Sequence, residues 1–208
     1  MSEAVFLLLF LLEFFVGSIM FSYWLGKIKG KDIRQTRDGN PGGSNLGRVF
    51  GWKWGMAGIV LDFLKGYVPL VFVVELGILQ NWRLAIVSVA PVLGHAFSPF
   101  LKFSGGKAVA VTFGIWSALT RWEVPVLLGT IFTIFSLTRA IRKKGKTTPA
   151  DDAARVMVGM LAVLVYVLMR GIPYLLPVWC MNMAILFYRH QRDIKAILVN
   201  QGSKRNAR

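Results

Sequence analysis

The stretch from Asp38 to Arg48 carries residue types suited to binding an anion. It reads Asp-Gly-Asn-Pro-Gly-Gly-Ser-Asn-Leu-Gly-Arg, with four glycines, and it lies between two long apolar runs. Glycine, proline and asparagine favour an irregular backbone, and successive N–H groups in turns form a concave anion nest. The guanidinium of Arg48 can bind a phosphate through two parallel hydrogen bonds. The stretch therefore predicts a phosphate-binding loop, and the competing interpretation is a plain connection between helices.

A second glycine-rich segment ends in Gly105-Gly106-Lys107, after a proline at position 99 that weakens the preceding helix. A glycine pair followed by lysine at a helix start combines free N–H groups, the positive dipole end and an ammonium. We expect a second anion site here. The spacing of a Walker loop is absent and no strand is predicted before it, so the segment does not indicate nucleotide hydrolysis. His95, at an apolar helix end, is more typical of a packing residue than of a catalyst.

Ionisable residues also lie inside an apolar run, in Asp62-Phe-Leu-Lys65-Gly66. A carboxylate and an ammonium at i and i+3 lie on one helical face and can neutralise each other. Gly66 lacks a side chain where a ligand or a neighbouring helix could approach. The two interpretations are an ion pair that fixes helix register and a secondary role of Lys65 as a ligand.

Composition places the chain in a membrane. Hydrophobic residues make up 55% and charged residues 17%, and the mean hydropathy is positive, which is typical of a chain that packs against lipid. The 25 Lys and Arg flank apolar runs instead of covering one soluble face, so no nucleic-acid partner is predicted. The single cysteine, Cys180, lies in an apolar run. Neither a disulfide nor a cysteine metal site is therefore expected, and no metal is predicted.

The apolar runs predict an all-α, polytopic membrane protein of about seven transmembrane helices. They span about residues 4–24, 56–79, 84–101, 109–119, 124–141, 156–169 and 174–188. The first is long enough to cross a hydrocarbon core of roughly 30 Å. Because no small-residue cleavage site follows it, a retained helix is expected rather than a signal peptide. We expect a single integral-membrane domain over 1–200 and a basic, disordered tail over 201–208.

Charge placement predicts the orientation of these spans. If the spans alternate, the segments 27–53, 102–107, 139–155 and 189–208 share one side, and they hold 21 of the 25 basic residues. Basic residues concentrate on the cytoplasmic side of membrane proteins. The N-terminus is therefore expected outside and the C-terminus in the cytoplasm, and both glycine-rich segments face the cytoplasm.

The motifs together resemble the bacterial acyl-phosphate-dependent glycerol-3-phosphate acyltransferase family. The match runs in order through residues 17–112 and weakly to the end. It is carried by Gly17-Ser18-Ile19, Gly39-Asn40-Pro41-Gly42 through Asn45 and Arg48, Asp62-x-x-Lys65-Gly66, Gly94-His95-x-Phe97-Ser98-x-Phe100-Leu101-Lys102-Phe103-x-Gly105-Gly106-Lys107, and Arg189-His190-x-x-Asp193-Ile194-Lys195. The resemblance implies an enzyme of the bacterial inner membrane that moves a fatty acyl group from acyl phosphate to the sn-1 hydroxyl of glycerol 3-phosphate. The resemblance also implies that lysophosphatidic acid is the product and that neither acyl-CoA nor a metal or other cofactor takes part.

An acyl phosphate is a mixed anhydride with a good leaving group, so the enzyme mainly has to hold two phosphates and orient a hydroxyl. By position in the matched motifs, phosphate contacts are assigned to Arg48 and Lys107. Substrate binding is further expected at Gly39, Gly42, Ser44, Asn45, Lys65, Gly66, His95, Ser98, Gly105 and Gly106, and catalysis at Asp38, Asn40, His190 and Asp193. The acyl tail can stay in lipid or lie between helices.

Three positions depart from the family pattern, in which Asp38 is usually Ser, Asp193 is usually Asn and Val158 is usually Ser. An ionised Asp38 beside a phosphate is costly unless it is paired or protonated. In one interpretation Asp38 is a general base or pairs with a basic group, and acyl transfer continues, with the same or another acceptor. In another, the chain is a divergent paralogue that binds lipid or a partner subunit without catalysis.

Two further interpretations concern the C-terminal motif and the fold. His190 and Asp193, at i and i+3, could form an oriented dyad, or they could belong to a basic tail at the lipid surface. Intramembrane Asp62 and Lys65 would also suit a small transporter with broken helices. No inverted repeat is apparent in the sequence, which argues against a transporter.

Overall fold

A computed structural model of the chain describes residues 2–142, 145 and 147–205, with the side chains of 198–205 excepted. The described part is helical and contains no strand. The α-helices are α1 (Glu3–Ser18), α2 (Phe21–Ile28), α3 (Gly43–Phe50), α4 (Trp52–Glu75), α5 (Asn81–Ala96), α6 (Val109–Thr120), α7 (Glu123–Ile141), α8 (Pro149–Arg170) and α9 (Leu175–Arg205). Two short 3-10 turns, η1 (Ile33–Gln35) and η2 (Pro99–Leu101), lie in the connections.

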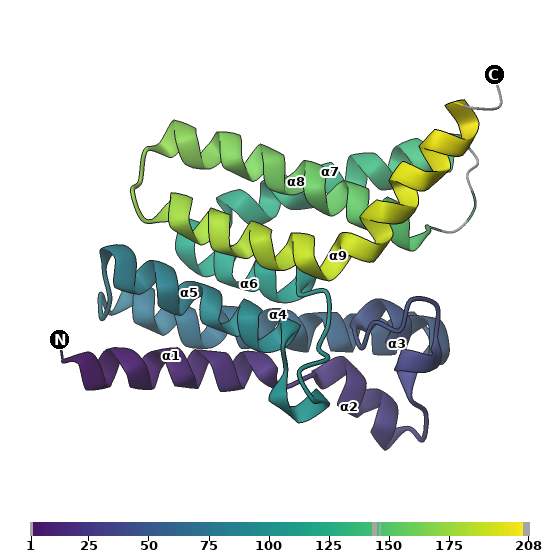
Figure 1. The fold of residues 1–208 in the computed structure, drawn as a ribbon. Coiled ribbons are helices and arrows are strands. Elements are labelled where there is room, and N and C mark those ends of the chain that lie inside the picture. Colours follow the sequence, from purple (N-terminus) through teal and green to yellow (C-terminus); the bar gives the residue numbers. More distant parts are fainter. Residues whose placement is uncertain (1, 143–144, 146, 206–208) are drawn as a thin grey trace.

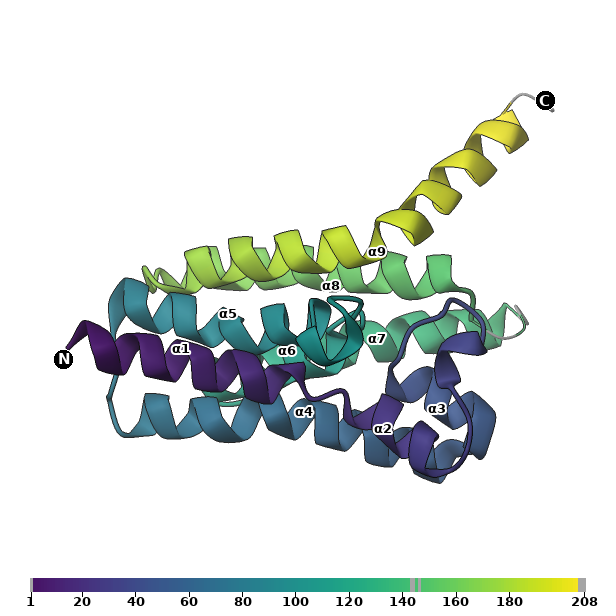
Figure 2. The same ribbon diagram turned by 60° about the horizontal axis from the view of Figure 1, so that its bottom comes forward.

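The long helices α1 and α4 to α9 lie side by side with similar axes (Figures 1 and 2). The short helices α2 and α3 lie at one end of this bundle, together with the segment before α6. The described C-terminus projects from the same end, and the N-terminus lies at the opposite end. The bundle therefore gathers the glycine-rich segments at one end, as their alternating positions between spans predicted.

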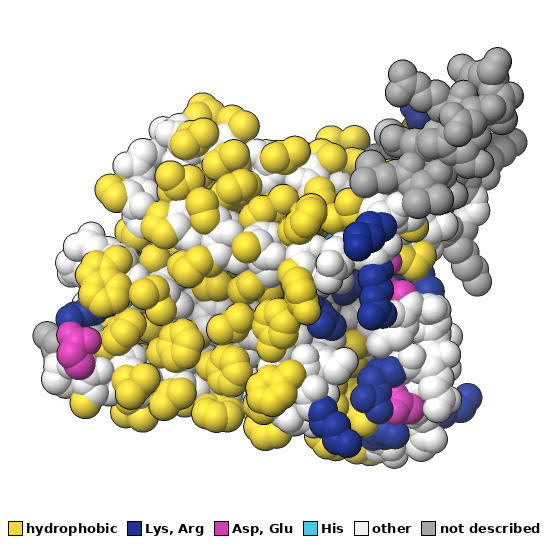
Figure 3. Space-filling view, in the orientation of Figure 1, with side chains coloured by type: hydrophobic (Ala, Val, Ile, Leu, Met, Phe, Trp, Pro, Cys, Tyr) yellow, Lys and Arg dark blue, Asp and Glu magenta, His cyan; other side chains and the backbone are white. Residues whose placement is uncertain are grey.

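The bundle has the surface of a membrane protein. Apolar side chains cover most of the face seen in Figure 3, and Lys and Arg gather at the end formed by α2 and α3. Five described helical segments are long and apolar enough to cross a membrane: Glu3–Ile28, Trp52–Glu75, Asn81–Leu101, Glu123–Ile141 and Pro149–Arg170. The predicted all-α membrane fold is confirmed. The number of seven spans and the orientation of the termini stay predictions, since α6 has only 12 residues and α9 joins an apolar half to a polar one.

Helix boundaries differ from the apolar runs in two places. The first run breaks at Ile19 and Met20 into α1 and α2, and the stretch from Gly43 to Arg48, which was predicted to be irregular, lies in α3. Glycines fit this short helix because it packs closely on α4. A Cβ atom on Gly43 would lie 2.8 Å from the carbonyl oxygen of Gly55. The predicted tail begins as helical backbone at 201–205, and 206–208 lie outside the described residues, so the domain limits stay a prediction.

The break between α1 and α2 is closed by the intramembrane ion pair. Lys65 Nζ lies 2.9 Å from Asp62 and donates a hydrogen bond of 2.5 Å to the carbonyl oxygen of Ile19. Ser22 donates to the other oxygen of Asp62 at 2.7 Å. A carbonyl freed by a helix break inside a membrane needs a donor, and Lys65 supplies it. These contacts favour the structural interpretation of the pair.

Glycines set the closest helix crossings. A Cβ atom on Gly94 of α5 would lie 2.1 Å from the carbonyl oxygen of Phe14 in α1, and one on Gly66 of α4 would lie 2.8 Å from the carbonyl oxygen of Val111 in α6. Glycines let membrane helices approach to backbone contact, where packing drives their association. Gly66 therefore serves a helix crossing.

The two ends of the bundle differ in charge. At the end that holds the N-terminus, Arg83 pairs with Glu3, Arg121 with Glu75 and Arg170 with Glu123. These three arginines lie outside the four segments that hold 21 of the 25 basic residues, and the three pairs balance their charges. The other end carries the basic excess, which is the charge asymmetry that the positive-inside rule uses.

The α1–α5 crossing gives a stability test. Gly94→Ala should lower the thermal midpoint in detergent, because the added methyl meets a backbone oxygen and overpacking costs about 1–3 kcal/mol. Gly129→Ala is the matched control, since a Cβ atom on Gly129 in α7 meets nothing within 4 Å. The control should be neutral or slightly stabilising. Equal midpoints for both variants, measured by circular dichroism, would contradict the close crossing.

The orientation can be tested with single cysteines in a Cys180→Ser background. Ser104 and Gln80 are exposed and lie at opposite ends of the bundle. If the basic end is cytoplasmic, a membrane-impermeant maleimide added to intact cells should label Gln80→Cys, and it should label Ser104→Cys only after permeabilisation. The reverse pattern would invert the topology.

Candidate functional site

A cavity of about 390 Å³ lies at the basic end of the bundle. Residues from all the helices from α3 to α9 line it, together with the loop before α3 and the segment before α6. Among the residues predicted for the site, its lining includes Asp38, Asn40, Gly42, Ser44, Asn45, His95, Lys107 and His190. The other predicted residues, Gly39, Arg48, Lys65, Gly66, Ser98, Gly105, Gly106 and Asp193, lie outside the lining. The structure therefore brings together the two glycine-rich segments and the C-terminal motif.

The N-terminus of α3 opens into this cavity. Gly42, Gly43 and Ser44 all line it, and Gly42 is the N-cap, with no side chain capping the helix. The first N–H groups of a helix have no partner within the helix, and they lie at the positive end of its dipole. An uncapped helix start in a cavity is a site for a phosphate or a carboxylate. The predicted irregular nest is wrong for Gly43 to Arg48, because these N–H groups belong to a helix. Anion binding at this helix start stays a prediction.

Asn45 shapes the loop that precedes α3. Its amide nitrogen lies within hydrogen-bonding distance of the carbonyl oxygens of Thr36, at 3.0 Å, and Asn40, at 2.9 Å, and of Oδ1 of Asp38, at 3.0 Å. Its own oxygen accepts a hydrogen bond from Arg48 at 3.4 Å. Buried Asn45 therefore holds the loop in a ring. Arg48 contacts Asn45 and does not line the cavity, so its direct contact with phosphate stays a prediction.

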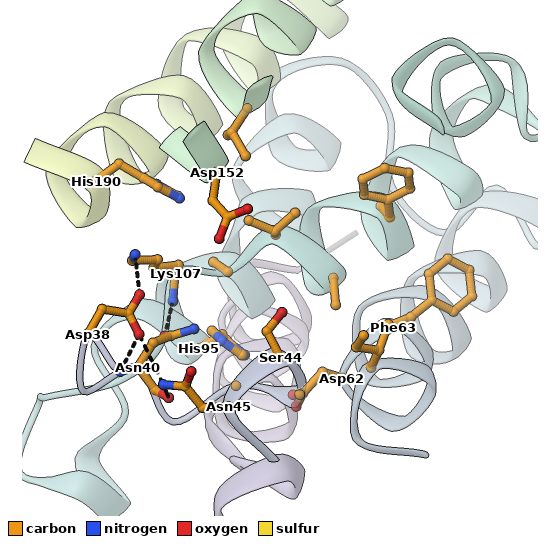
Figure 4. A pocket seen from close by; sticks show the side chains of 18 of the residues that line it. Asp38, Asn40, Ser44, Asn45, Asp62, Phe63, His95, Lys107, Asp152 and His190 are labelled. Carbon is orange, nitrogen blue, oxygen red and sulfur yellow. Dashed lines mark hydrogen bonds and ion pairs between the residues drawn. The ribbon is translucent and has the colours of Figure 1, made fainter. Parts of the chain in front are cut away.

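Lys107 is the centre of the polar contacts (Figure 4). Its amine lies 2.5 Å from Oδ2 of Asp38 and 2.6 Å from Oδ2 of Asp193, and its backbone N–H donates to Oδ1 of Asn40 at 3.0 Å. Burial raises the pKa of the Asp38 carboxyl, but its ion pair with Lys107 and its hydrogen bond from Asn45 outweigh burial and hold the pKa below its ordinary value. Asp38 is therefore ionised at neutral pH and paired with a basic group.

The turn that carries Lys107 is fixed by its neighbours. Gly106 donates its N–H to the carbonyl oxygen of His95 at 3.0 Å, and Arg189 of α9 donates to the carbonyl oxygens of Gly105 and Gly106. A Cβ atom on Gly105 would lie 2.0 Å from the same His95 oxygen. The expectation that this glycine pair starts a helix is wrong, since α6 begins at Val109. The N–H groups of Gly106 and of the lysine serve protein acceptors.

His95 and Ser98 help to fix the turn that carries Lys107. A Cβ atom on Gly106 would lie 2.3 Å from Nε2 of His95, whose side chain is buried. Ser98 is buried as well, and its hydroxyl donates to the carbonyl oxygen of Ser18 at 2.7 Å. His95 therefore both lines the cavity and packs against the glycine turn, and Ser98 ties η2 to the end of α1.

His190 lies past the apolar half of α9 and lines the cavity. Its Nδ1 lies 2.8 Å from the carbonyl oxygen of Leu186. Because a carbonyl oxygen only accepts, Nδ1 carries the proton, and in the neutral ring Nε2 keeps a free lone pair. Burial lowers the pKa of His190 below its ordinary value of 6.5, so the neutral form prevails at neutral pH. The contacts do not form the suggested dyad, since Asp193 pairs with Lys107.

A second charged cluster was not recognised in the sequence. Asp152 of α8 pairs with Arg37 at 2.7 Å and with Arg155 at 2.9 Å, and all three residues line the cavity. Arg37 also donates to the carbonyl oxygen of Thr147 at 2.8 Å. The loop before α3 is therefore tied to the start of α8, and two arginines line the cavity into which α3 opens. The sequence contained one sign of this cluster, the position of Arg37 directly before Asp38.

The cavity also has an apolar branch. Its walls are Ile59, Val60, Phe63, Val109, Ala110, Phe113, Phe132 and Val156. Figure 4 shows Phe63 on the side away from Lys107 and Asp38. Ile59 is 37% and Val60 is 45% exposed on α4, so this branch reaches the surface that would face lipid. One cavity thus joins a cationic head site to an apolar groove, which is the shape of a binding site for an amphiphilic anion.

Residues that could hold a metal are not clustered. Among the residues described, no group of three or more His, Cys, Asp or Glu side chains is arranged to bind a metal ion.

Comparison with known proteins identifies the family of this chain. A family model described as glycerol-3-phosphate acyltransferase matches residues 7–200. Glycerol-3-phosphate acyltransferase 1 of Thermotoga maritima is 47% identical over 192 residues, covering 90% of this chain and 95% of the relative. Glycerol-3-phosphate acyltransferase of Maridesulfovibrio salexigens is 33% identical over 190 residues, covering 90% and 91%.

Solved structures give the same result for the fold. The crystal structure of PlsY (YgiH), an integral membrane glycerol 3-phosphate acyltransferase, in its glycerol 3-phosphate form matches with a TM-score of 0.78 and 28% identity. The match covers 94% of this chain and 93% of the chain in the crystal structure. The lysophosphatidic acid form matches with a TM-score of 0.75. With its helical membrane fold and these matches over nearly its full length, the chain belongs to the glycerol-3-phosphate acyltransferase family of integral membrane enzymes.

Proposed function

We propose that this protein transfers a fatty acyl group from acyl phosphate to the sn-1 hydroxyl of glycerol 3-phosphate, forming lysophosphatidic acid and inorganic phosphate. The observation that carries the proposal is a single cavity that joins the uncapped N-terminus of α3, the cations Arg37, Lys107 and Arg155, and an apolar branch. The relatives named above are glycerol-3-phosphate acyltransferases, which supports the acceptor. The acyl phosphate donor rests on the family resemblance of the motifs and on the anionic character of the site.

The chemistry asks little of the protein beyond binding and proton transfer. Both substrates carry a phosphate, and the α3 N-terminus with the cations around it suits two such groups. The mixed anhydride already has a good leaving group. Holding the hydroxyl beside the acyl carbon therefore supplies much of the rate, since positioning alone contributes several kcal/mol, about 7–11 at best.

His190 is the residue that we assign to accept the proton. As the sn-1 oxygen attacks the carbonyl carbon, Nε2 takes the hydroxyl proton, the bond from that carbon to the phosphate oxygen breaks, and phosphate leaves with the bonding pair. The hydrogen bond from Nδ1 to Leu186 fixes the tautomer that this step needs. Asp38 is less suited to the role, because its lowered pKa and its ion pair with Lys107 make it a weak base.

The apolar branch accounts for the acyl chain. The chain would lie along Phe63, Phe113 and Phe132, with its carbonyl near the cationic head site. Because Ile59 and Val60 are exposed on α4, the tail could enter from the lipid without crossing water. The excess of basic residues at this end supports an active site on the cytoplasmic side of the bacterial inner membrane.

The reaction and the base are tested together. Purified protein with acyl phosphate and radiolabelled glycerol 3-phosphate should yield lysophosphatidic acid. His190→Gln should reduce turnover by about 10²–10⁴-fold, the usual contribution of a general base. The ratio of wild-type to variant turnover should fall as pH drops below 6.5, the ordinary pKa of histidine, because protonation of His190 removes its lone pair.

Because wild type and His190→Gln are compared at each pH, the effect of titrating the substrate phosphates cancels in the ratio. The thermal midpoint of the variant reports whether it folds. No product from the wild type, with a competent relative assayed alongside, would contradict the reaction and favour a lipid-binding paralogue. A pH-independent ratio would remove His190 as the base while leaving the reaction intact.

The acyl branch gives a separate prediction. Phe132 meets Phe113 edge-to-face at 5.5 Å in the branch. Phe132→Ala should enlarge the branch and shift the kcat/KM preference toward longer acyl chains by about tenfold. Phe72→Ala is the matched control, because Phe72 lies on α4 outside the cavity and is 60% exposed. An equal shift in both variants, or in neither, would contradict this path for the chain.

A further inference from the structure

The cations that line the cavity are all paired with carboxylates. Arg37 and Arg155 share Asp152, and the amine of Lys107 is shared by Asp38 and Asp193. Two carboxylates on one ammonium leave that group with a net negative charge. A substrate phosphate therefore cannot simply add to Lys107. It has to exchange with an anion that the protein already holds there.

The two carboxylates on Lys107 are held with different strength. Besides the ion pair, Oδ1 of Asp38 accepts hydrogen bonds from the Asn45 amide at 3.0 Å and from the Asn40 N–H at 3.4 Å. These donors fix Asp38 in its loop. In the part of the chain that the structure describes, Lys107 is the one ion-pair partner of Asp193. The weaker attachment predicts which carboxylate leaves.

The position of Asp193 also allows it to leave. It lies on α9 three residues beyond His190, and the C-terminal part of this helix diverges from the rest of the bundle (Figure 2). Arg189, one turn earlier, stays bound to the carbonyl oxygens of the glycine turn. Release of Asp193 would therefore leave the turn and Lys107 in place while freeing one face of the amine.

We propose that Asp193 is an internal competitor for the phosphate site: it occupies Lys107 in the empty cavity and is displaced when a substrate phosphate binds. The inference rests on the proposed function for its substrates and makes Asp193 a residue that sets phosphate affinity. It does not make Asp193 a base, because an ammonium at 2.6 Å stabilises the ionised carboxylate. A purely structural ion pair between Asp193 and Lys107 would persist when substrate binds, whereas the proposed competitor is displaced.

The test uses Asp193→Asn, which keeps the shape of the side chain and removes its charge. Binding of inorganic phosphate and of glycerol 3-phosphate is measured by calorimetry in detergent, and kcat and KM are measured with acyl phosphate. The variant should bind inorganic phosphate about tenfold more tightly, because a like charge near the ligand is gone. The KM for glycerol 3-phosphate should fall similarly, and kcat reports separately whether the carboxylate takes part in the chemical step.

Asp32→Asn is the matched control. Asp32 lies at the same end and pairs with Lys27 and Arg34, so it reports the general effect of losing one negative charge there. Its phosphate affinity should equal that of wild type. Asp193→Ala repeats the measurement without an amide that could bind phosphate itself.

Three outcomes would overturn the proposal. Unchanged or weaker phosphate binding in both Asp193 variants would show that the carboxylate does not compete. A loss of kcat by a hundredfold or more with unchanged binding would make Asp193 catalytic. An equal gain of phosphate affinity in Asp32→Asn would show that the effect comes from the loss of any one negative charge at this end of the bundle. Because phosphate binding is measured without turnover, tighter binding in a protein that makes no lysophosphatidic acid would uphold the inference and defeat the proposed function.

Discussion

The ammonium of Lys107 is the interaction on which the site depends. It joins Asp38 from the loop before α3 to Asp193 from α9, segments that lie at opposite ends of the sequence. A charge that is removed from water has to be paired, and the pairing closes the loop and the last helix around the same turn. The polar end of the bundle is thereby held by electrostatics, whereas the apolar body is held by packing.

The membrane environment explains the helical structure and the close helix crossings of the apolar body. Lipid offers no hydrogen-bond partners, so the chain is helical through the apolar body, and the carbonyl oxygen of Ile19 at the α1–α2 break accepts a hydrogen bond from Lys65. Helices approach closely where glycine removes the side chain, as at Gly94 and Gly66. These close crossings fix the helices firmly enough to place α3, whose N-terminus opens into the cavity.

The sequence predicts the helical membrane fold well, because apolar runs and basic flanks report directly on lipid and on the two sides of the bundle. It also identifies both glycine-rich segments. It fails where a contact depends on three-dimensional packing. Glycines made α3 look like a loop, since nothing local shows that Gly43 packs on α4. The pairing of Arg37 with Asp152 spans 115 residues. Nothing in the sequence indicates that Asp38 and Asp193 contact the same amine, that of Lys107.

A cavity with one polar and one lipid-facing branch has a consequence for turnover. In the proposed reaction two compounds are released, one soluble in water and the other an amphiphile. The inorganic ion can depart through the charged mouth, while the acylated glycerol can slide past Ile59 and Val60 into the surrounding leaflet. The solvents on the two sides of the cavity thus sort the products by phase, and an insoluble lipid never has to be carried through the aqueous compartment.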